Sequence, residues 1–149
     1  MLNLNKSTRY ALYAAMEMAS TGGGEPITAA DTARRYGVPG SVLAKVFQQL
    51  VRGGIAIGER GSHGGYRLAR DPAELTILDV VEAMEPGRGP GICLLEDSEE
   101  TECSRTGDCR LFRVFEEVDE LARSTFASIT LETLVRSPRP GRQVPLRHP

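Results

Sequence analysis

Residues 27–54 read ITAADTARRYGVPGSVLAKVFQQLVRGG, and the pattern of this stretch decides which fold the sequence predicts. Thr28 and Asp31 have the spacing of a helix-capping pair, so a short helix is expected to run to about Tyr36. The run from Gly37 to Gly40 then forces a turn, because glycine permits positive φ and proline disfavours helix in the preceding residue. Two short helices joined by such a turn predict a helix-turn-helix.

The second helix of this unit is expected to run from a cap at Ser41 to about Arg52, where two glycines end it. Apolar side chains recur along one side, at Val42, Leu43, Val46, Phe47 and Leu50. Polar side chains lie largely on the other side, at Ser41, Lys45, Gln48, Gln49 and Arg52. Such a side can read base edges or grip phosphates in a major groove, or it can be a solvated face. Its place in a helix-turn-helix favours DNA.

Residues 55–69, IAIGERGSHGGYRLA, predict a β-hairpin directly after this helix. The stretch 60–65 is too rich in glycine for anything but a tight, exposed tip. A hairpin in this place is the wing of a winged helix. Arg60 at its base is placed to enter a minor groove, whose negative potential attracts a guanidinium group. His63 at the tip is expected to meet phosphate or solvent rather than to bind a metal.

Two further helices should flank this unit. Residues 6–20 are apolar around most of a helical circumference, so this first helix must be buried on several sides. Thr76 and Asp79 form a second capping pair, for a helix that runs to about Glu85 and is closed by a proline and a glycine.

A long helix is expected to begin at Asp108, which is a suitable cap. Apolar residues recur along it at intervals of three, four or seven, at Leu111, Val114, Phe115, Val118, Leu121, Ala122 and Ile129. An apolar row on a helix that leaves a compact domain calls for a partner, and a second copy of the chain is the simplest one. Packing back onto the first helix of the same chain is the alternative.

All three cysteines of the sequence lie between the capped helix and the long helix, at Cys93, Cys103 and Cys109. The residues between them are acidic and polar, so the segment should be a loop. A loop that carries every thiol, with an odd count, is more typical of a ligand-bearing loop than of a disulfide framework.

The charge is unevenly distributed. Residues 1–70 carry nine Lys and Arg against four Asp and Glu, whereas residues 71–135 carry five against sixteen. This division suggests that only the first half faces a polyanion, although chance scatter would give a similar picture. The sequence has no apolar run of membrane-spanning length and no signal-peptide layout at its start, so we expect a cytoplasmic protein in which thiols stay reduced.

These motifs together resemble the winged-helix transcriptional regulators of the IscR/NsrR/CymR type, over about residues 1–135. The resemblance is carried by LNKSTRYALYAAMEMA at the start, by VPGSVLAKVFQQL, and above all by RGSHGGYRLARDPAELTILDVVEAME. It implies a mainly α fold with a small β-hairpin wing, and a long C-terminal dimerisation helix. It further implies a homodimer, typically a repressor, that binds a pseudo-palindromic operator in double-stranded DNA.

The resemblance also implies roles for particular residues. Ser41, Val42 and Lys45 would lie in the major groove, and Arg60 would probe the minor groove. The full set of candidate DNA-binding residues is Thr28, Ser41, Val42, Lys45, Gln48, Gln49, Arg60, Ser62 and His63. Cys93, Cys103 and Cys109 would ligate an iron–sulfur cluster, either 2Fe–2S or 4Fe–4S, that changes how the dimer binds DNA.

The fourth cluster ligand is open. Relatives with a 2Fe–2S centre usually have a His three residues after the third Cys, where this chain has Phe112. Relatives with a 4Fe–4S centre can use a carboxylate near the N-terminus; the corresponding region of this chain reads Ser7-Thr8-Arg9, and Arg9 cannot ligate iron. Asp108, Glu102, a group from the other subunit, or an exogenous ligand could complete the set.

The expected organisation has four parts: a winged helix-turn-helix in residues 1–85, a cysteine-bearing effector loop in 86–108, a dimerisation helix in 109–135 and a disordered tail in 136–149. The leading function is a regulator that senses redox state, nitric oxide or iron–sulfur status through its cluster. One alternative is a regulator that senses through its thiols, or holds zinc, without a cluster. Another is a winged helix used for protein–protein contact. The sequence shows neither a glycine-rich phosphate loop nor a nucleophile with an adjacent base, so we do not expect an enzyme.

Overall fold

The computed structural model describes residues 4–22, 24–86 and 110–136. The expected cluster ligands Cys93, Cys103 and Cys109 lie outside these residues, as does the expected C-terminal tail of residues 136–149 except for Arg136, which ends a helix. The described part is mainly helical with one antiparallel hairpin, as expected. Its elements are α1 (Lys6–Ser20), α2 (Ala29–Tyr36), α3 (Gly40–Arg52), β1 (Ala56–Glu59), β2 (Gly65–Leu68), α4 (Ile77–Met84), α5 (Arg110–Ser128) and α6 (Leu131–Arg136).

The helix-turn-helix forms as the local sequence predicts. The Thr28 hydroxyl accepts a hydrogen bond from the Asp31 backbone N–H at 3.0 Å, which satisfies one of the exposed amides at the start of α2. Gly37 ends α2 with φ of 63°, in the left-handed region, and its N–H donates to the Ala33 carbonyl. The chain then turns directly into α3.

The start of α3 differs from the expected cap at Ser41. The helix begins at Gly40 and its N-cap is Pro39, with φ of −57° and no side-chain hydrogen bond. The Pro39 carbonyl accepts from the backbone N–H groups of Val42 and Leu43, at 3.0 and 3.3 Å. The fixed φ of proline already suits the start of a helix, so no hydroxyl cap is required and Ser41 stays exposed in the first turn.

The hairpin pairs Ala56 with Leu68 at one end and Glu59 with Gly65 at the other. A single bridge joins it to the loop before α2, where Ile27 and Tyr66 exchange backbone hydrogen bonds of 2.9 and 2.8 Å. A Cβ on Gly65 would lie 2.6 Å from the Ile27 carbonyl oxygen, so the approach of these backbones requires glycine. The wing is therefore tied to the helix-turn-helix by this bridge as well as by its direct connection to α3.

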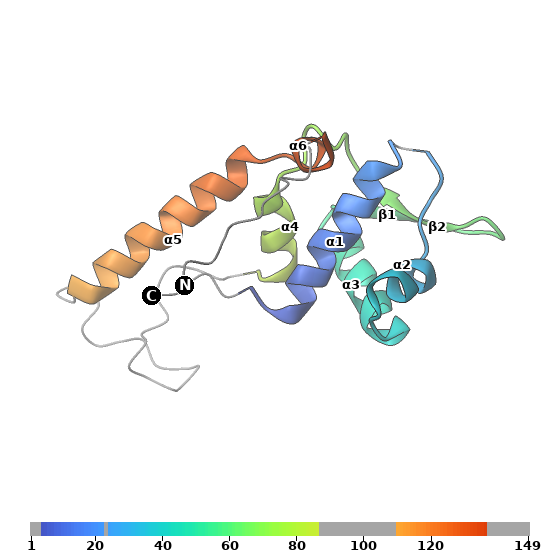
Figure 1. The fold of residues 1–149 in the computed structure, drawn as a ribbon, viewed down its shortest axis with the longest axis horizontal. Helices are drawn as coiled ribbons and strands as arrows, with labels where there is room; N and C mark the ends of the chain where they lie inside the picture. The colour runs from blue at the N-terminus through green and yellow to red at the C-terminus, as the bar shows by residue number, and fades with distance from the viewer. Residues whose placement is uncertain (1–3, 23, 87–109, 137–149) are drawn as a thin grey trace, which may run out of the picture.

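The core lies around α1, which packs against α3, α4, α6 and β2 (Figure 1). Its largest fully buried side chains are Phe47, Met18, Leu43, Leu50, Ile55, Leu75 and Leu131. Phe47 of α3 stacks on Tyr66 of β2, with ring centroids 4.4 Å apart and an interplanar angle of 20°. This stack fixes the wing against the helix that precedes it.

The long helix ends earlier than expected. It stops at Ser128, so Ile129, which we assigned to its apolar row, lies beyond it. The Ile77 N–H donates to the Ile129 carbonyl at 3.0 Å, and the Leu131 N–H donates to the Leu75 carbonyl at 2.8 Å. These bonds draw the chain across the start of α4 and turn it into α6, whose Leu131 is fully buried.

Candidate nucleic-acid interface

The exposed side of α3 presents Ser41, Lys45 and Gln48, as the helical period predicts. The opposite side of the helix is anchored in the core by Leu43, Val46, Phe47 and Leu50, all of which are buried. A helix held on one side and polar on the other can enter a major groove without exposing apolar side chains.

Val42 and Gln49 lie differently from the other candidates on α3. Val42 is half-buried and packs against the core. Gln49 is also half-buried, and its side-chain amide donates to the Met84 carbonyl of α4 at 3.4 Å. The expected polar row is therefore narrower than the sequence suggested, since Gln49 turns toward α4.

The wing tip is exposed and carries the remaining candidates. Arg60, Ser62 and His63 are all exposed, and the Ser62 hydroxyl lies 3.1 Å from Nδ1 of His63. Gly61 has φ of 120°, a conformation that side chains rarely adopt, so the tight tip requires glycine there. Just below the tip, Glu59 at the end of β1 forms an ion pair with Arg67 of β2 across the two strands.

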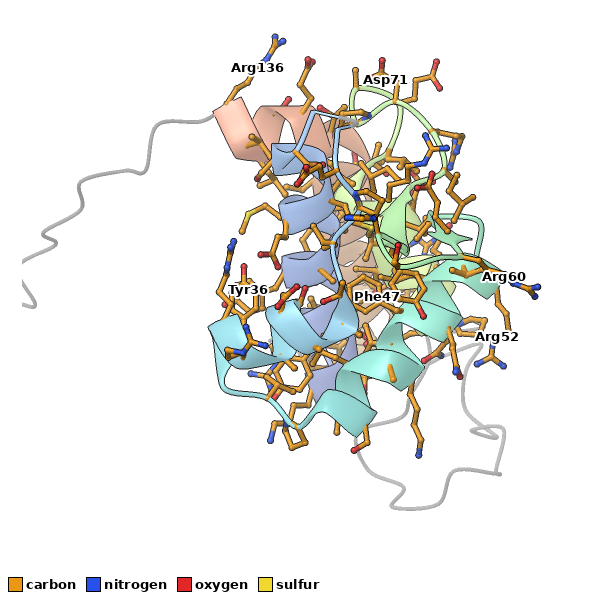
Figure 2. All side chains as sticks on the ribbon, turned by 90° about the vertical axis from the view of Figure 1, so that its right-hand side faces the viewer. Tyr36, Phe47, Arg52, Arg60, Asp71 and Arg136 are labelled. Atoms are coloured by element: carbon orange, nitrogen blue, oxygen red, sulfur yellow. The ribbon has the colours of Figure 1, made fainter. Side chains whose placement is uncertain are left out.

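A further cation lies beside this surface. Arg52, at the end of α3, is exposed, and Figure 2 shows its side chain pointing to the same side of the molecule as that of Arg60. The sequence placed Arg52 on the polar side of the helix but did not single it out. Its relation to Arg60 depends on how the hairpin folds back toward α3, which helical periodicity does not reveal.

The last candidate, Thr28, has a structural partner. Its side chain caps α2 and its hydroxyl also donates to Oδ2 of Asp31 at 2.7 Å. A residue at a helix N-terminus can still face a phosphate, because the neighbouring backbone N–H groups point the same way.

Helix α2 is fastened to α1 by an ion pair and two stacked rings. Glu17 of α1 is buried, and its Oε1 lies 2.5 Å from the guanidinium of Arg35. Tyr36 stacks on Tyr13, with ring centroids 5.0 Å apart. Burial, and secondly the Glu17 carboxylate, raises the pKa of the Tyr36 hydroxyl above its ordinary value.

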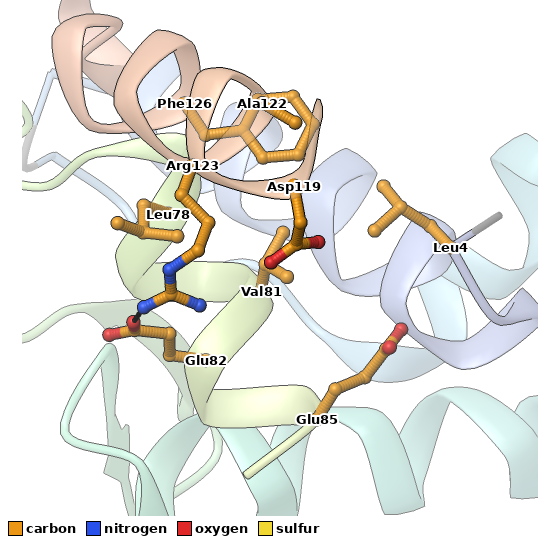
Figure 3. Close-up of a pocket in the computed structure, with 9 residues that line it drawn as sticks. All are labelled: Leu4, Leu78, Val81, Glu82, Glu85, Asp119, Ala122, Arg123 and Phe126. Carbon is orange, nitrogen blue, oxygen red and sulfur yellow. Dashed lines mark hydrogen bonds and ion pairs between the residues drawn. The ribbon is translucent and has the colours of Figure 1, made fainter. Parts of the chain in front are cut away.

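The seam between α4 and α5 contains a small cavity of about 30 Å³, shown in Figure 3. Leu78 and Val81 of α4 and Phe126 of α5 line it, and Arg123 of α5 pairs with Glu82 of α4 at 2.5 Å. The space is enough for a water molecule and too small for an organic ligand. This seam is therefore a packing contact of α5 with its own chain, made to α4 rather than to α1.

A different side of α5 is apolar and exposed. Leu111, Val114, Phe115, Val118 and Leu121 are each between 45% and 64% exposed. An apolar row of this length is rare on the surface of a monomer. None of the helices described in residues 4–136 has the length and apolar character needed to cross a membrane.

Comparison with known proteins gives a family match over almost the whole chain. Residues 4–137 match the Rrf2 family, which is described as an iron-dependent transcriptional regulator. A relative, the putative HTH-type transcriptional regulator BadM of Rhodopseudomonas palustris, is 35% identical over 91% of this chain and 82% of its own length. The HTH-type transcriptional regulator IscR of Xenorhabdus nematophila is 27% identical over 91% of this chain and 80% of its own.

Solved structures of such regulators share the fold. CymR, the global cysteine regulator of B. subtilis, matches with a TM-score of 0.72 and 25% identity, over 91% of this chain and 97% of that one. The IscR of T. potens matches with a TM-score of 0.67 and 25% identity, over 90% and 86%. The hairpin after α3 corresponds to the wing of these winged-helix proteins, which confirms the expected fold class.

Proposed function

Because the chain belongs to the Rrf2 family of transcriptional regulators, we propose that it acts as a homodimeric repressor whose hold on a pseudo-palindromic operator depends on an iron–sulfur cluster. The relatives are named as transcriptional regulators, so regulation rather than catalysis is the role of the chain. The observation that carries the proposal is the exposed polar side of α3 beside the exposed Arg60 of the wing.

The contacts with DNA divide into two kinds. Ser41, Lys45 and Gln48 of α3 are exposed and have the donors that read base edges or grip phosphates in a major groove. Arg60 and His63 of the wing would lie over the adjacent minor groove and its phosphates, where a guanidinium gains most from the negative potential.

The dimer is supported by the exposed apolar row of α5. Its five side chains share one side of the helix, while Arg123 and Phe126 face α4 on another. The same row on a second copy would cover it, because a two-fold axis brings identical surfaces together. In Figure 1, α5 lies at the opposite end of the molecule from the hairpin, which leaves the wing accessible for DNA.

The cluster is supported by the chemistry of its donors and by the IscR relatives. Three thiolates, from Cys93, Cys103 and Cys109, suit iron–sulfur clusters. At the start of α1, Arg9 is exposed and cannot ligate iron, and Thr8 is buried in hydrogen bonds to Asn5 and Glu85. When bound, the cluster would supply iron that reacts with oxidants or nitric oxide.

Replacing Arg60 with Ala is expected to weaken operator binding about 5- to 100-fold, because one minor-groove cation per protomer is lost. The slope of log affinity against log salt concentration should fall by about one for each protomer. Arg136→Ala is the matched control, since Figure 2 shows this arginine far from Arg60 in the same view. Equal effects of the two changes on fluorescence anisotropy with an operator fragment would refute the assignment of Arg60.

Replacing Cys103 with Ala is expected to abolish the visible absorbance of anaerobically purified protein and to lower its iron and sulfide content to background. Ser104→Ala, the adjacent position, should leave both unchanged. Wild-type protein that stays colourless after anaerobic reconstitution would overturn the cluster part of the proposal and leave DNA binding standing.

A cluster-free regulator that senses through its thiols is the second candidate. The structural likeness to the cysteine regulator CymR favours it. In that case operator affinity would change on thiol oxidation alone, with no iron or sulfide in the protein, and metal analysis separates the two candidates.

A further inference from the structure

The C-terminal end of α4 contacts three other helices within a few residues. Ala83 and Met84 meet α3, Glu85 meets α1, and Glu82 pairs with Arg123 of α5. Pro86 follows at once and is the first residue of the expected cysteine-bearing segment. The chain therefore enters that segment directly from this end of α4.

The contact with α3 is partly a hydrogen bond. Met84 is the last residue of α4, so its carbonyl has no partner within the helix. The side-chain amide of Gln49, 35 positions earlier in the sequence, donates a hydrogen bond to this carbonyl at 3.4 Å. Gln49 is the half-buried member of the polar row, whereas its neighbour Gln48 is exposed.

The contact with α3 is also a close approach of two backbones. A Cβ on Gly53, just after α3, would lie 2.5 Å from Cβ of Ala83 and 3.2 Å from its Cα. Gly53 has φ of −78°, which any residue adopts, so packing against α4 and not backbone conformation requires glycine there. The end of the DNA-facing helix therefore rests directly on α4.

The contact with α1 is polar. Oε1 of Glu85 accepts from the Thr8 hydroxyl at 2.5 Å and from the Asn5 backbone N–H at 3.1 Å. Thr8 is fully buried, so this bond anchors the end of α4 inside the domain. Through Arg123, the same short helix is also joined to the proposed dimerisation helix.

We infer that Gln49 is a positioning residue rather than a base-reading one, and that the contact of α3 with Ala83 and Met84 transmits the state of the cysteine-bearing segment to the DNA-facing helix. This inference rests on the proposed function. Packed helices shift as units, and a shift at this contact would move Lys45 and Gln48 relative to the operator. Because of the contacts of Gln49 and Gly53 with α4, a shift of α4 would move α3 with it.

The first test uses the whole protein without DNA. Gln49→Met keeps the length of the side chain and removes its donor, and Gln48→Met is the matched control on the exposed side. Hydrogen exchange of backbone amides at the end of α4 should become about 3- to 10-fold faster in Gln49→Met and stay unchanged in Gln48→Met. Unchanged exchange in Gln49→Met would overturn the inference whether or not the chain binds DNA.

The second test measures operator affinity for metal-free reduced protein and for protein reconstituted with iron and sulfide. The ratio of the two affinities is the coupling. Gln49→Met should reduce the wild-type ratio at least about threefold and keep the base-pair preferences of the operator. Gln48→Met should keep the ratio and relax the preference at one base pair.

The outcomes separate the inference from the proposed function. If the wild-type affinity ratio differs from one and Gln49→Met leaves that ratio unchanged, the inference is overturned and the proposed function stands. A wild-type ratio of one would remove the regulation itself, and with it the inference. A loss of preference at a single base pair in Gln49→Met would show that Gln49 reads DNA after all.

A packing variant tests the same contact independently. Gly53→Ala forces α3 and α4 apart and should weaken operator binding about fivefold or more. The double change Gly53→Ala with Ala83→Gly removes the clashing Cβ and should restore most of that affinity. A double variant as weak as Gly53→Ala would count against transmission through this contact.

Discussion

A Val118→Asp variant is expected to be monomeric and to lose operator binding at concentrations that saturate with wild-type protein. Val118 is 53% exposed and lies at the centre of the apolar row of α5. A carboxylate there would be buried without a partner in the dimer, which costs several kcal/mol and weakens dimerisation about 100-fold or more. Operator binding falls with it, because two linked half-sites bind far more tightly than one.

Light scattering and sedimentation measure the mass of each variant in solution, which is compared with the 16.2 kDa of one chain. Ser124→Asp is the matched control, because Ser124 is exposed on the same helix, about a third of a turn from the centre of the row. It should remain dimeric and bind operator normally. If Val118→Asp keeps twice the chain mass at micromolar concentration, α5 is not the interface.

Local chemistry in the sequence was enough to place most helix ends. The first helix was expected over residues 6–20 and is observed from Lys6 to Ser20. Thr28 and Thr76 cap α2 and α4 as their spacing to Asp31 and Asp79 predicted, and the second pair forms a complete capping box. These features depend on residues within one helical turn, which a sequence displays directly.

Apart from the start of α3, which Pro39 sets locally, the differences arise where contacts between distant segments decide the structure. Gln49 belongs to the polar row by helical period, yet its side-chain amide donates a hydrogen bond to the carbonyl of Met84, 35 positions away. The long helix has the expected apolar row, but pairing of Ile129 and Leu131 with the chain before α4 ends it at Ser128. Neither effect is visible in a periodicity, since each needs the position of α4.

The candidate site divides in the same way. Ser41, Lys45 and Gln48 are exposed because the opposite side of α3 is apolar, and this follows from sequence. The position of Arg60 relative to α3 depends instead on the hairpin register and on the bridge between Ile27 and Tyr66. The sequence therefore predicted which residues face outward better than how they face one another.

Replacing Phe47 with Ala is expected to lower the free energy of unfolding by about 3–5 kcal/mol, because a fully buried aromatic side chain is removed and a cavity remains. The stack on Tyr66 is lost as well, and with it the side-chain contact that holds the wing against α3. This loss is a large part of the stability of a domain, because the free energy of unfolding of native proteins is only about 5–15 kcal/mol in total.

Urea unfolding followed by circular dichroism measures this loss, at one protein concentration because a dimer gains stability with concentration. Ile57→Ala is the control, since Ile57 lies on the same wing and is 39% exposed, and it should cost much less. Phe47→Leu should fall between the two, because it keeps the apolar contact and loses the stack. If Phe47→Ala costs no more than Ile57→Ala, the wing is not held by this stack, and the orientation of Arg60 must depend on the backbone bridge to Ile27 alone.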